Sequence, residues 1–195
     1  DYEAVAICLL NSYANPAHEE ELAGIIARHC QGMQVACSSA VTREFREYER
    51  ASTTTLSAYV QPVINRYLEK FEDRLTGSGF TGRFSVMQSN GGRLPAEGMR
   101  RNAITALLSG PAAGVMGAVR QAARSGHHNL VTFDMGGTST DVCLVTDGKP
   151  DLTSEFALDG LPIRTPIIDI NTVGAGGGSI IWIDDGGMLR AGPQS

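Results

Sequence analysis

The sequence predicts an α/β protein, and three observations lead to this fold class. Hydrophobic residues make up 42% of the 195 residues and charged residues 19%, which is below the roughly 25% of an average soluble domain. The chain can therefore bury an ordinary core, within one domain or one domain and part of a second. Short apolar segments alternate with amphipathic helical segments in the first half, which is typical of βαβ units. Residues 110–125 then predict a helix of mostly small residues, which divides the chain into two parts.

The charge is unevenly distributed along the chain. Residues 1–125 carry 13 Lys/Arg and 12 Asp/Glu, whereas residues 126–195 carry 3 and 9. Basic runs with interleaved aromatic residues are missing, so no nucleic-acid partner is expected. The acidic second part suits a divalent cation, although a solvated surface is the simpler explanation of the charge alone. The longest apolar run, 4–10, is far shorter than the ~18 residues of a membrane span, so no membrane partner is expected either.

The cysteines favour a cytoplasmic protein with reduced thiols, since no pair has the C-x-x-C spacing of a zinc or redox site. They are Cys8, Cys30, Cys37 and Cys143. The sequence opens without a methionine or a basic-then-apolar leader, and it ends just after a Gly-Pro. We therefore expect an internal piece of a longer polypeptide.

The first elements in the chain predict a βαβ crossover. Residues 4–10 predict a buried strand, and Asn15 is expected to cap a helix whose first position is Pro16. The acidic residues 19–21 fall in its first turn, where they favour the helix dipole. Its apolar face is expected to consist of Leu22, Ile25, Ile26 and His29. A second strand follows at 33–37.

A long helix is predicted at residues 52–76. Ser52 or Thr53 is expected to cap it, and Gly77 and Gly79 to end it. One stripe at helical spacing is expected to face the core. It consists of Leu56, Val60, Val63, Tyr67, Phe71 and Leu75. A strand at 84–88 is then predicted, closed by a turn at 89–92.

The second part of the chain is predicted to be mostly strands. Pro111 marks the start of the small-residue helix, whose bare face lets another backbone approach closely. Strands are predicted at 130–133 and 142–145, joined by a tight polar turn. Short strands with Asp-Gly, Pro and Gly turns follow to residue 195.

The strongest functional motif is this polar turn, Asp134-Met-Gly-Gly-Thr-Ser-Thr-Asp141. Adjacent glycines allow amide N–H groups to converge on one point, which is how a backbone nest binds phosphate without a cationic side chain. Three hydroxyls add donors, and the carboxylates of Asp134 and Asp141 suit the water shell of Mg²⁺. An ordinary hairpin is the alternative, because Gly-Gly turns are common. It does not account for two flanking aspartates and three hydroxyls within eight residues, so we favour a phosphate-binding turn.

The succession of small-residue helix, strand and phosphate-binding turn resembles the superfamily of actin, sugar kinases and heat-shock chaperone ATPases. Within it, six collinear segments are similar to the hydantoinase A/5-oxoprolinase family. They are Leu9 to Pro16, Glu44 to Arg50, Met87 to Gly92, Leu107 to Val115, Phe133 to Val142 and Asp169 to Ser179. The resemblance covers nearly the whole chain. It implies a ribonuclease H-like (actin-like ATPase) fold with parts of two domains: a first lobe at 1–109, a connecting helix at 110–125 and the start of a second lobe at 126–195.

The resemblance also implies ATP-dependent opening of a cyclic amide, such as 5-oxoproline or a hydantoin. Phosphorylation of the amide carbonyl oxygen would make cleavage of the C–N bond by water feasible, with Mg²⁺ or another divalent metal and N–H donors offsetting the phosphoryl charge. Asp134 and Asp141 would organise the metal and the attacking oxygen as catalytic residues. The residues expected to bind the cofactor ATP are Gly136, Gly137, Thr138, Ser139, Gly110, Gly176 and Gly177.

Three further assignments rest on the same resemblance. Ser89, Asn90 and Gly91 are expected in a substrate-binding loop, although Asn-Gly is also the commonest tight hairpin signal. The glycine-rich segment 174–179 lies near substrate or nucleotide, or is a structural turn; its glycine spacing does not fit a dinucleotide fingerprint. Asn171 stands where many family members have histidine, which argues against metal ligation at that position; Asp169 alone is the candidate metal ligand of this segment.

Three functions therefore stay open: a cyclic amide hydrolase, an ATP-dependent carboxylase subunit of the acetone or acetophenone type, and a non-catalytic nucleotide-switched module. The expected partners are the cyclic amide, the remainder of the polypeptide and a second hydantoinase subunit. The superfamily uses two phosphate loops, and only one is found in this sequence. We therefore expect these 195 residues alone to bind ATP weakly or not at all.

Overall fold

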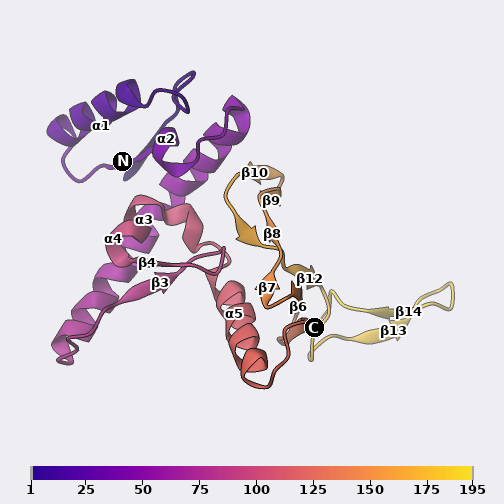
Figure 1. Ribbon diagram of the computed structural model, residues 1–195. Coiled ribbons are helices and arrows are strands. Elements are labelled where there is room, and N and C mark those ends of the chain that lie inside the picture. Colours follow the sequence, from indigo (N-terminus) through magenta and orange to yellow (C-terminus); the bar gives the residue numbers. More distant parts are fainter. Residues whose placement is uncertain (1, 195) are drawn as a thin grey trace. The chain divides into compact units, whose positions relative to one another are not determined.

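The computed structural model describes residues 2–194, which form two compact units of mixed α/β structure (Figure 1). The first unit comprises the residues up to Ser109 together with Ser154–Ile167, and the second comprises Gly110–Thr153 and the residues from Ile168 onward. The α/β class predicted from the sequence is confirmed. The lobe boundaries at 110 and 126 stay a prediction, because the observed units divide the chain at 109 and group 154–167 with the earlier residues.

The first unit begins with the predicted crossover. Strand β1 (Ala4–Ile7) pairs in parallel with β2 (Gln34–Cys37) through helix α1 (Ala17–His29). The strand ends at Ile7, and Leu10 is 78% exposed in the turn that follows. A buried strand reaching residue 10 was therefore too long a prediction.

Helix α1 presents a different face to the core from the one its apolar spacing predicts. The helix begins at Ala17 with Pro16 as its N-cap, so the predicted cap at Asn15 and first position at Pro16 are each one residue too early. Asn15 lies just before the cap, where its Oδ1 accepts a hydrogen bond from the Ala17 N–H at 3.1 Å. The predicted apolar face is wrong, because Leu22 and Ile25 are exposed.

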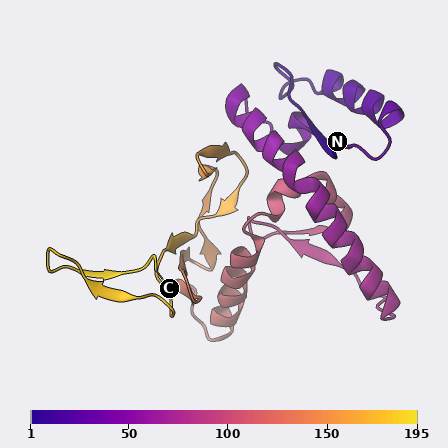
Figure 2. The same ribbon diagram turned by 180° about the vertical axis from the view of Figure 1, so that it is seen from behind.

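The long helix α3 (Glu47–Gly77) runs through the first unit (Figure 2) and begins five residues earlier than predicted. Its buried side is largely polar and consists of Arg50, Thr53, Thr54, Ser57, Ala58, Gln61, Pro62 and Leu68. The predicted core stripe is wrong, since Val63 and Tyr67 are each 59% exposed. The helix ends at Gly77 as the glycines predict.

Shorter elements complete the first unit. They are α2 (Ser38–Val41), β3 (Ser85–Met87), β4 (Arg93–Pro95), α4 (Ala96–Arg101), the 3₁₀ helix η1 (Ala103–Ala106), β9 (Phe156–Leu158) and β10 (Leu161–Ile163). Together with α3 and β2, these elements form two apolar clusters, one around Ile104 and Ile163 and one around Leu68 and Met99.

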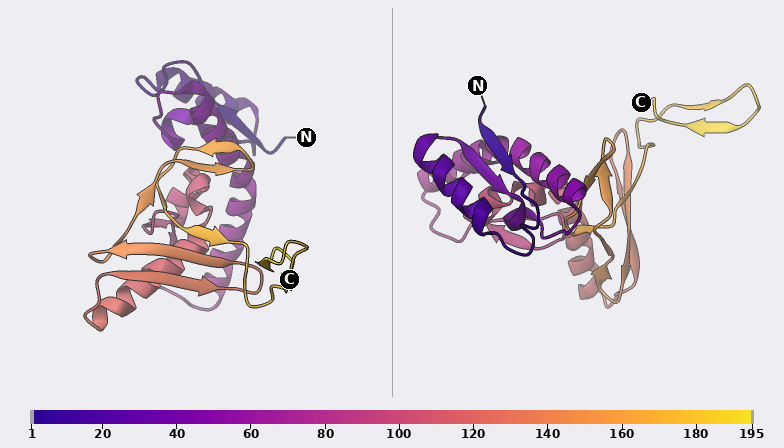
Figure 3. Two further views of the ribbon diagram at one scale, coloured as in Figure 1. Left: turned by 90° about the vertical axis from the view of Figure 1, so that its right-hand side faces the viewer. Right: turned by 90° about the horizontal axis from the view of Figure 1, so that it is seen from above.

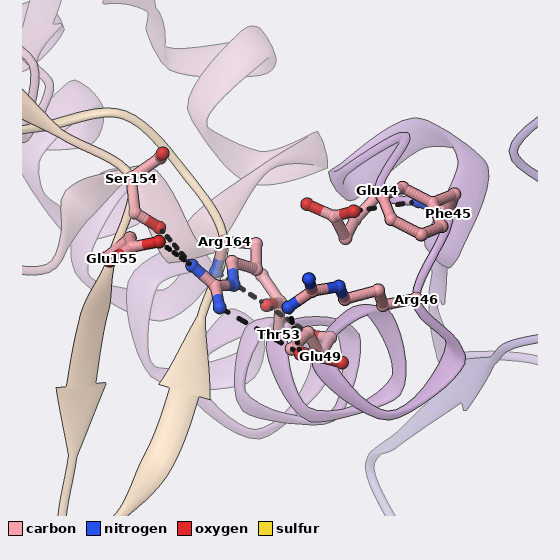
Figure 4. A network of polar contacts seen from close by, with 8 residues as sticks. All are labelled: Glu44, Phe45, Arg46, Glu49, Thr53, Ser154, Glu155 and Arg164. Atoms are coloured by element: carbon pink, nitrogen blue, oxygen red, sulfur yellow. Dashed lines mark hydrogen bonds and ion pairs between the residues drawn. The ribbon is translucent and has the colours of Figure 1, made fainter.

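Polar contacts hold the late segment 154–167 to helix α3 (Figure 4). The Arg164 N–H donates to Thr53 Oγ1 at 2.9 Å, and the Arg164 guanidinium lies 3.9 Å from Glu49 and 3.7 Å from Glu155. These contacts explain why a segment more than 100 residues away in sequence belongs to the first unit.

In the second unit, helix α5 (Ser109–Arg124) covers one face of a small sheet (Figure 3). The sheet has the order β12-β6-β5, with β7 also pairing with β6. The bounds of these strands are β5 Leu130–Met135, β6 Thr140–Thr146, β7 Lys149–Pro150 and β12 Asn171–Val173. The core between helix and sheet consists of Ala112, Val115, Val119, Cys143, Val145 and Ile168.

The remaining strands are short, as the turn-rich sequence predicts. They are β8 (Leu152–Thr153), β11 (Ile167–Ile168) and a hairpin of β13 (Ile181–Ile183) and β14 (Leu189–Ala191) that extends away from the sheet (Figures 1 and 2). No helix within residues 2–194 is long and apolar enough to cross a membrane.

The four cysteines are free thiols. Cys143 is buried in the second unit, and burial, together with the charges of Asp169 and Asp151, raises the pKa of its thiol. It acts as a small apolar core residue.

Candidate functional site

Two aspartates lie opposite each other on adjacent strands at the base of the polar turn. Strands β5 and β6 are antiparallel with Asp134 opposite Asp141, so the two side chains lie on the same face of the sheet. This is the face that α5 covers, because the same register places Thr132 opposite the buried Cys143. The folding of one hairpin is thus enough to bring the two predicted acids together.

The turn between them, residues 136–139, leaves amide N–H groups available. The Gly136 N–H donates to Ser139 O at 2.9 Å and closes the turn. Within residues 2–194, no hydrogen bond engages the N–H groups of Gly137, Thr138 and Ser139. Three consecutive donors without a protein partner suit an anion, as a backbone nest requires.

A second glycine-rich loop, residues 174–178, lies directly against this turn. The Gly177 N–H donates to Gly136 O at 2.9 Å, and the Gly178 N–H donates to Gly137 O at 2.8 Å. The backbones approach so closely that a Cβ on Gly176 would lie 2.6 Å from Gly136 O. The structure therefore brings together Gly136, Gly137, Gly176 and Gly177, which are far apart in sequence.

The amides of the second loop are already used within the protein. The Gly176 N–H donates to Ser179 Oγ at 2.8 Å, and that of Gly177 is bonded to Gly136. In this conformation both N–H groups donate to protein acceptors, and a cofactor role for Gly176 and Gly177 stays a prediction. Their contact with the 136–139 turn is their observed interaction.

A cavity of about 490 Å³ opens between α5 and β5, and both acids line it. On the helix side it is lined by Pro111, Gly114, Val115 and Ala118. Gly114 leaves room above Asp134, because a Cβ built there would lie 3.6 Å from Asp134 Oδ2. Gly110 is not among the lining residues, so its contact with a cofactor stays a prediction.

Thr172 is a residue at this site that the sequence reasoning missed. Its hydroxyl donates to Asp141 Oδ1 at 2.7 Å, because β12 pairs with β6 and places Thr172 opposite Asp141. The only sequence signal was its position three residues after Asp169, and the strand pairing that makes the contact cannot be read from that spacing.

Asp169 does not complete a metal site with the two acids. Its N–H donates to Asp151 O at 2.9 Å, and among the described residues 2–194 no group of three His, Cys, Asp or Glu side chains could hold a metal ion. The metal role of Asp134 and Asp141 therefore rests on two carboxylates, and that of Asp169 stays a separate prediction.

The predicted substrate loop belongs to the first unit and is a tight turn between β3 and β4. Asn90 Oδ1 accepts a hydrogen bond from the Gly92 N–H at 2.8 Å, so this side chain stabilises its own turn. Ser89 is 2% exposed, and its hydroxyl has no hydrogen-bond partner among the described residues. The turn follows the hairpin interpretation of Asn-Gly, and a substrate role for Ser89, Asn90 and Gly91 stays a prediction.

Comparison with known proteins decides the family. The sequence profile described as hydantoinase/oxoprolinase matches residues 50–195. The chain belongs to the hydantoinase/oxoprolinase family.

Relatives of this family match the chain over almost its whole length. The crystal structure of the ATP-dependent caprolactamase from Pseudomonas jessenii is 38% identical with a TM-score of 0.85, and the match covers 99% of this chain and 28% of that chain. A nucleotide-free acetone carboxylase structure is 30% identical with a TM-score of 0.76 over 99% of this chain and 28% of that one. The 5-oxoprolinase of Saccharomyces cerevisiae is 37% identical over 99% of this chain and 15% of its own length. The chain thus spans less than a third of the length of these relatives.

Proposed function

We propose that this chain contributes a phosphate-binding turn to an ATP-dependent hydrolase that opens a cyclic amide of the 5-oxoproline or hydantoin type. One observation carries the proposal: Asp134 and Asp141 lie opposite each other on adjacent strands, both line a cavity, and the turn beside them has three N–H groups without a partner among residues 2–194. The similarity to an ATP-dependent caprolactamase and to a 5-oxoprolinase supports both the nucleotide and the class of substrate.

Each group in this arrangement has a chemical role in the proposal. The amides of Gly137, Thr138 and Ser139 stabilise the negative charge that develops on a transferring phosphoryl group, since fixed donors cost no reorganisation during the reaction. ATP supplies the phosphoryl group that activates the amide carbonyl, so that water can cleave the C–N bond. Asp134 and Asp141 would hold the cation and the oxygen that attacks the phosphoryl group in place.

The two carboxylates fit a magnesium ion. Proteins usually hold Mg²⁺ by one or two carboxylates, with waters and phosphate oxygens completing the octahedron. Asp134 and Asp141 lie opposite each other on adjacent strands, and Asp141 is fixed by Thr172. When bound, the cation supplies positive charge that offsets the charge of the phosphate oxygens.

The fold proposal follows from the same site. We assign the unit to a ribonuclease H-like lobe whose first hairpin, β5–β6, carries the turn, with α5 as the connecting helix that precedes it. In the superfamily the nucleotide lies between two such lobes, each with its own phosphate loop. The remainder of the polypeptide would supply the other half of the cradle, and a second hydantoinase subunit is a separate partner in the proposal.

Substitution of Asp134 in the full-length protein tests the proposal. Asp134→Ala is expected to lower the rate of ATP hydrolysis by about 100-fold or more, as the loss of a transition-state charge contact does. Asp147→Asn, in the exposed turn after β6, is the matched control and is expected to retain the wild-type rate. Intact ATP hydrolysis in Asp134→Ala would contradict the proposal.

A carboxylase is the second candidate, and the similarity to acetone carboxylase favours it. The two reactions share activation by ATP and differ in the acceptor. ATP hydrolysis that depends on a cyclic amide supports the hydrolase, and ATP hydrolysis that depends on a ketone together with bicarbonate supports the carboxylase. Nucleotide binding without turnover of either substrate would indicate a nucleotide-switched module.

A further inference from the structure

The second unit has two glycine-rich segments, the 136–139 turn and the 174–178 loop. Their hydrogen bonds show that they have different roles. In the turn, the carbonyl oxygens of Gly136 and Gly137 accept hydrogen bonds, whereas in the loop the N–H groups of Gly176, Gly177 and Gly178 donate them. Gly136 O and Gly137 O each accept a hydrogen bond from the loop, at 2.9 and 2.8 Å. The next two N–H groups along the turn, those of Gly137 and Thr138, have no partner among residues 2–194.

Peptide geometry links these two facts. The C=O of one residue and the N–H of the next belong to the same planar unit, and in a trans peptide they point in opposite directions. A loop that binds the Gly136 carbonyl therefore turns the Gly137 N–H away from itself. The same constraint applies to the Gly137 carbonyl and the Thr138 N–H.

We infer that the 174–178 loop is a positioning element that fixes the direction of the phosphate-binding amides of Gly137 and Thr138. This inference rests on the proposed function, because it names what holds the anion site open for a nucleotide phosphate. The loop does not touch the phosphate in this arrangement; it acts through the turn.

Two further contacts make the loop a rigid support. Gly176 lies against the turn so closely that a Cβ would come within 2.6 to 2.8 Å of the Gly136 and Gly137 main chain. The Thr140 hydroxyl donates to Ala175 O at 2.6 Å and fastens the loop to the start of β6. Thr140 is only 4% exposed, so water does not compete for this bond.

A matched pair of glycine variants in the full-length protein tests the inference. In Gly176→Ala the methyl group collides with main-chain atoms that cannot swing aside, so the turn must move. In Gly174→Ala the methyl group meets nothing within 4 Å, and the same loop gains the same group without a collision. We expect Gly176→Ala to raise the KM for MgATP by about tenfold or more, the loss of one or two charge-assisted hydrogen bonds, and Gly174→Ala to leave it within about twofold.

A second pair of variants separates positioning from folding. Thr140→Val keeps the size of the side chain and removes the donor to Ala175, whereas Thr140→Ser keeps the donor. We expect Thr140→Val to raise the KM for MgATP about threefold to tenfold, the worth of one buried hydrogen bond, and Thr140→Ser to restore most of the wild-type value. Equal KM values in wild type, Gly176→Ala and Thr140→Val would overturn the inference.

Hydrogen exchange without nucleotide distinguishes this inference from the proposed function. The N–H groups of Gly177 and Gly178 are expected to be protected in wild type and Gly174→Ala, and to lose protection in Gly176→Ala. If this pattern holds but wild type does not bind MgATP, the proposed function fails and the positioning contact stands. If Gly176→Ala retains the protection, the loop does not hold the turn and the inference is wrong.

Discussion

Glu19 is the clearest case of a single residue whose surroundings decide its role. Its side chain is fully buried, and it accepts hydrogen bonds from the Leu9 N–H, the Ser38 hydroxyl, and the N–H and hydroxyl of Ser39. Burial alone would raise the pKa of this carboxyl, but the four hydrogen bonds outweigh it and lower the pKa from 4.5 to about 2. The charged carboxylate thus ties the end of β1 to the start of α2.

The pH dependence of stability should report this carboxylate. Because its pKa is lower in the folded state, its stabilising contribution is complete above pH 4.5 and is lost as the pH falls toward 2. The shift corresponds to roughly 3 kcal/mol in the free energy of unfolding. Glu19→Gln is expected to lose about that amount at pH 7 and to flatten the dependence between these pH values, measured by urea unfolding. Glu20→Gln, on the exposed side of α1, is the control; a wild-type pH profile in Glu19→Gln would contradict this account.

At the site, one missing side chain determines access to Asp134. Gly114→Ala places a methyl group at ordinary contact distance from the carboxylate, and it is expected to stabilise the helix by about 0.5–1 kcal/mol. Gly114→Leu would place a bulky side chain in the cavity beside Asp134, and we expect at least about tenfold weaker MgATP binding with little change in melting temperature. Calorimetric titration of both full-length variants checks the prediction. Equal affinity in Gly114→Leu and wild type would show that no ligand occupies this cavity.

Among the elements, helix α3 departs furthest from its sequence pattern. Its buried side is polar because the neighbouring segments present main-chain groups to it. The fully buried Arg50 donates to Ser38 Oγ, Glu44 O and Leu9 O at 3.1, 2.8 and 2.7 Å. Helical spacing identifies an apolar stripe but not the face of the helix that a neighbouring segment covers. The spacing therefore predicts that the stripe through Val63 and Tyr67 faces the core, which the structure does not show.

Arg50 and Arg46 provide a matched pair at the start of this helix. Arg50→Ala removes three hydrogen bonds of a fully buried side chain and leaves Glu44 O without its partner. We expect a loss of about 3–5 kcal/mol in the free energy of unfolding. Arg50→Lys keeps the charge but not the fork of donors, so it should recover only part of the loss. The side chain of Arg46 is 57% exposed, and Arg46→Ala should change stability by less than about 1 kcal/mol. Similar losses in the two alanine variants by chemical denaturation would contradict the network.

The hairpin β5–β6 was predictable because its elements are local in sequence. Apolar strands flanking Gly136 and Gly137 fix the turn, and the strand period then sets Asp134 opposite Asp141. The contact with Gly176 and the bond from Thr172 were not predictable, because they depend on which strand pairs with β6 some 30 residues later. The local sequence thus predicts the turn, whereas the contacts that hold it in place depend on the tertiary fold.

In the whole molecule, the chain crosses between its two compact units more than once. Residues 154–167 return to the first unit, where the partly buried Arg164 side chain faces Glu49 and Glu155 (Figure 4). The sequence does not predict that residues 154–167 belong to the first unit, since their pattern indicates only short strands and turns.

Loss of the Arg164 side chain should loosen this segment locally. Arg164→Ala retains the main-chain bond to Thr53 and removes the guanidinium contacts, so we expect a cost of about 0.5–1.5 kcal/mol and faster amide exchange in residues 156–163 alone. Arg101→Ala, which removes an exposed pair with Glu97, is the control. Unchanged exchange of residues 156–163, or a uniform increase across both units, would contradict the contact.

A crystal structure of the full-length protein with Mg²⁺ and a non-hydrolysable ATP analogue tests the account most directly. We expect oxygens of the nucleotide phosphates within hydrogen-bond distance of the Gly137 and Thr138 nitrogens, with the cation beside Asp134 and Asp141. Nucleotide bound elsewhere, with the 136–139 turn in contact only with solvent, would contradict it.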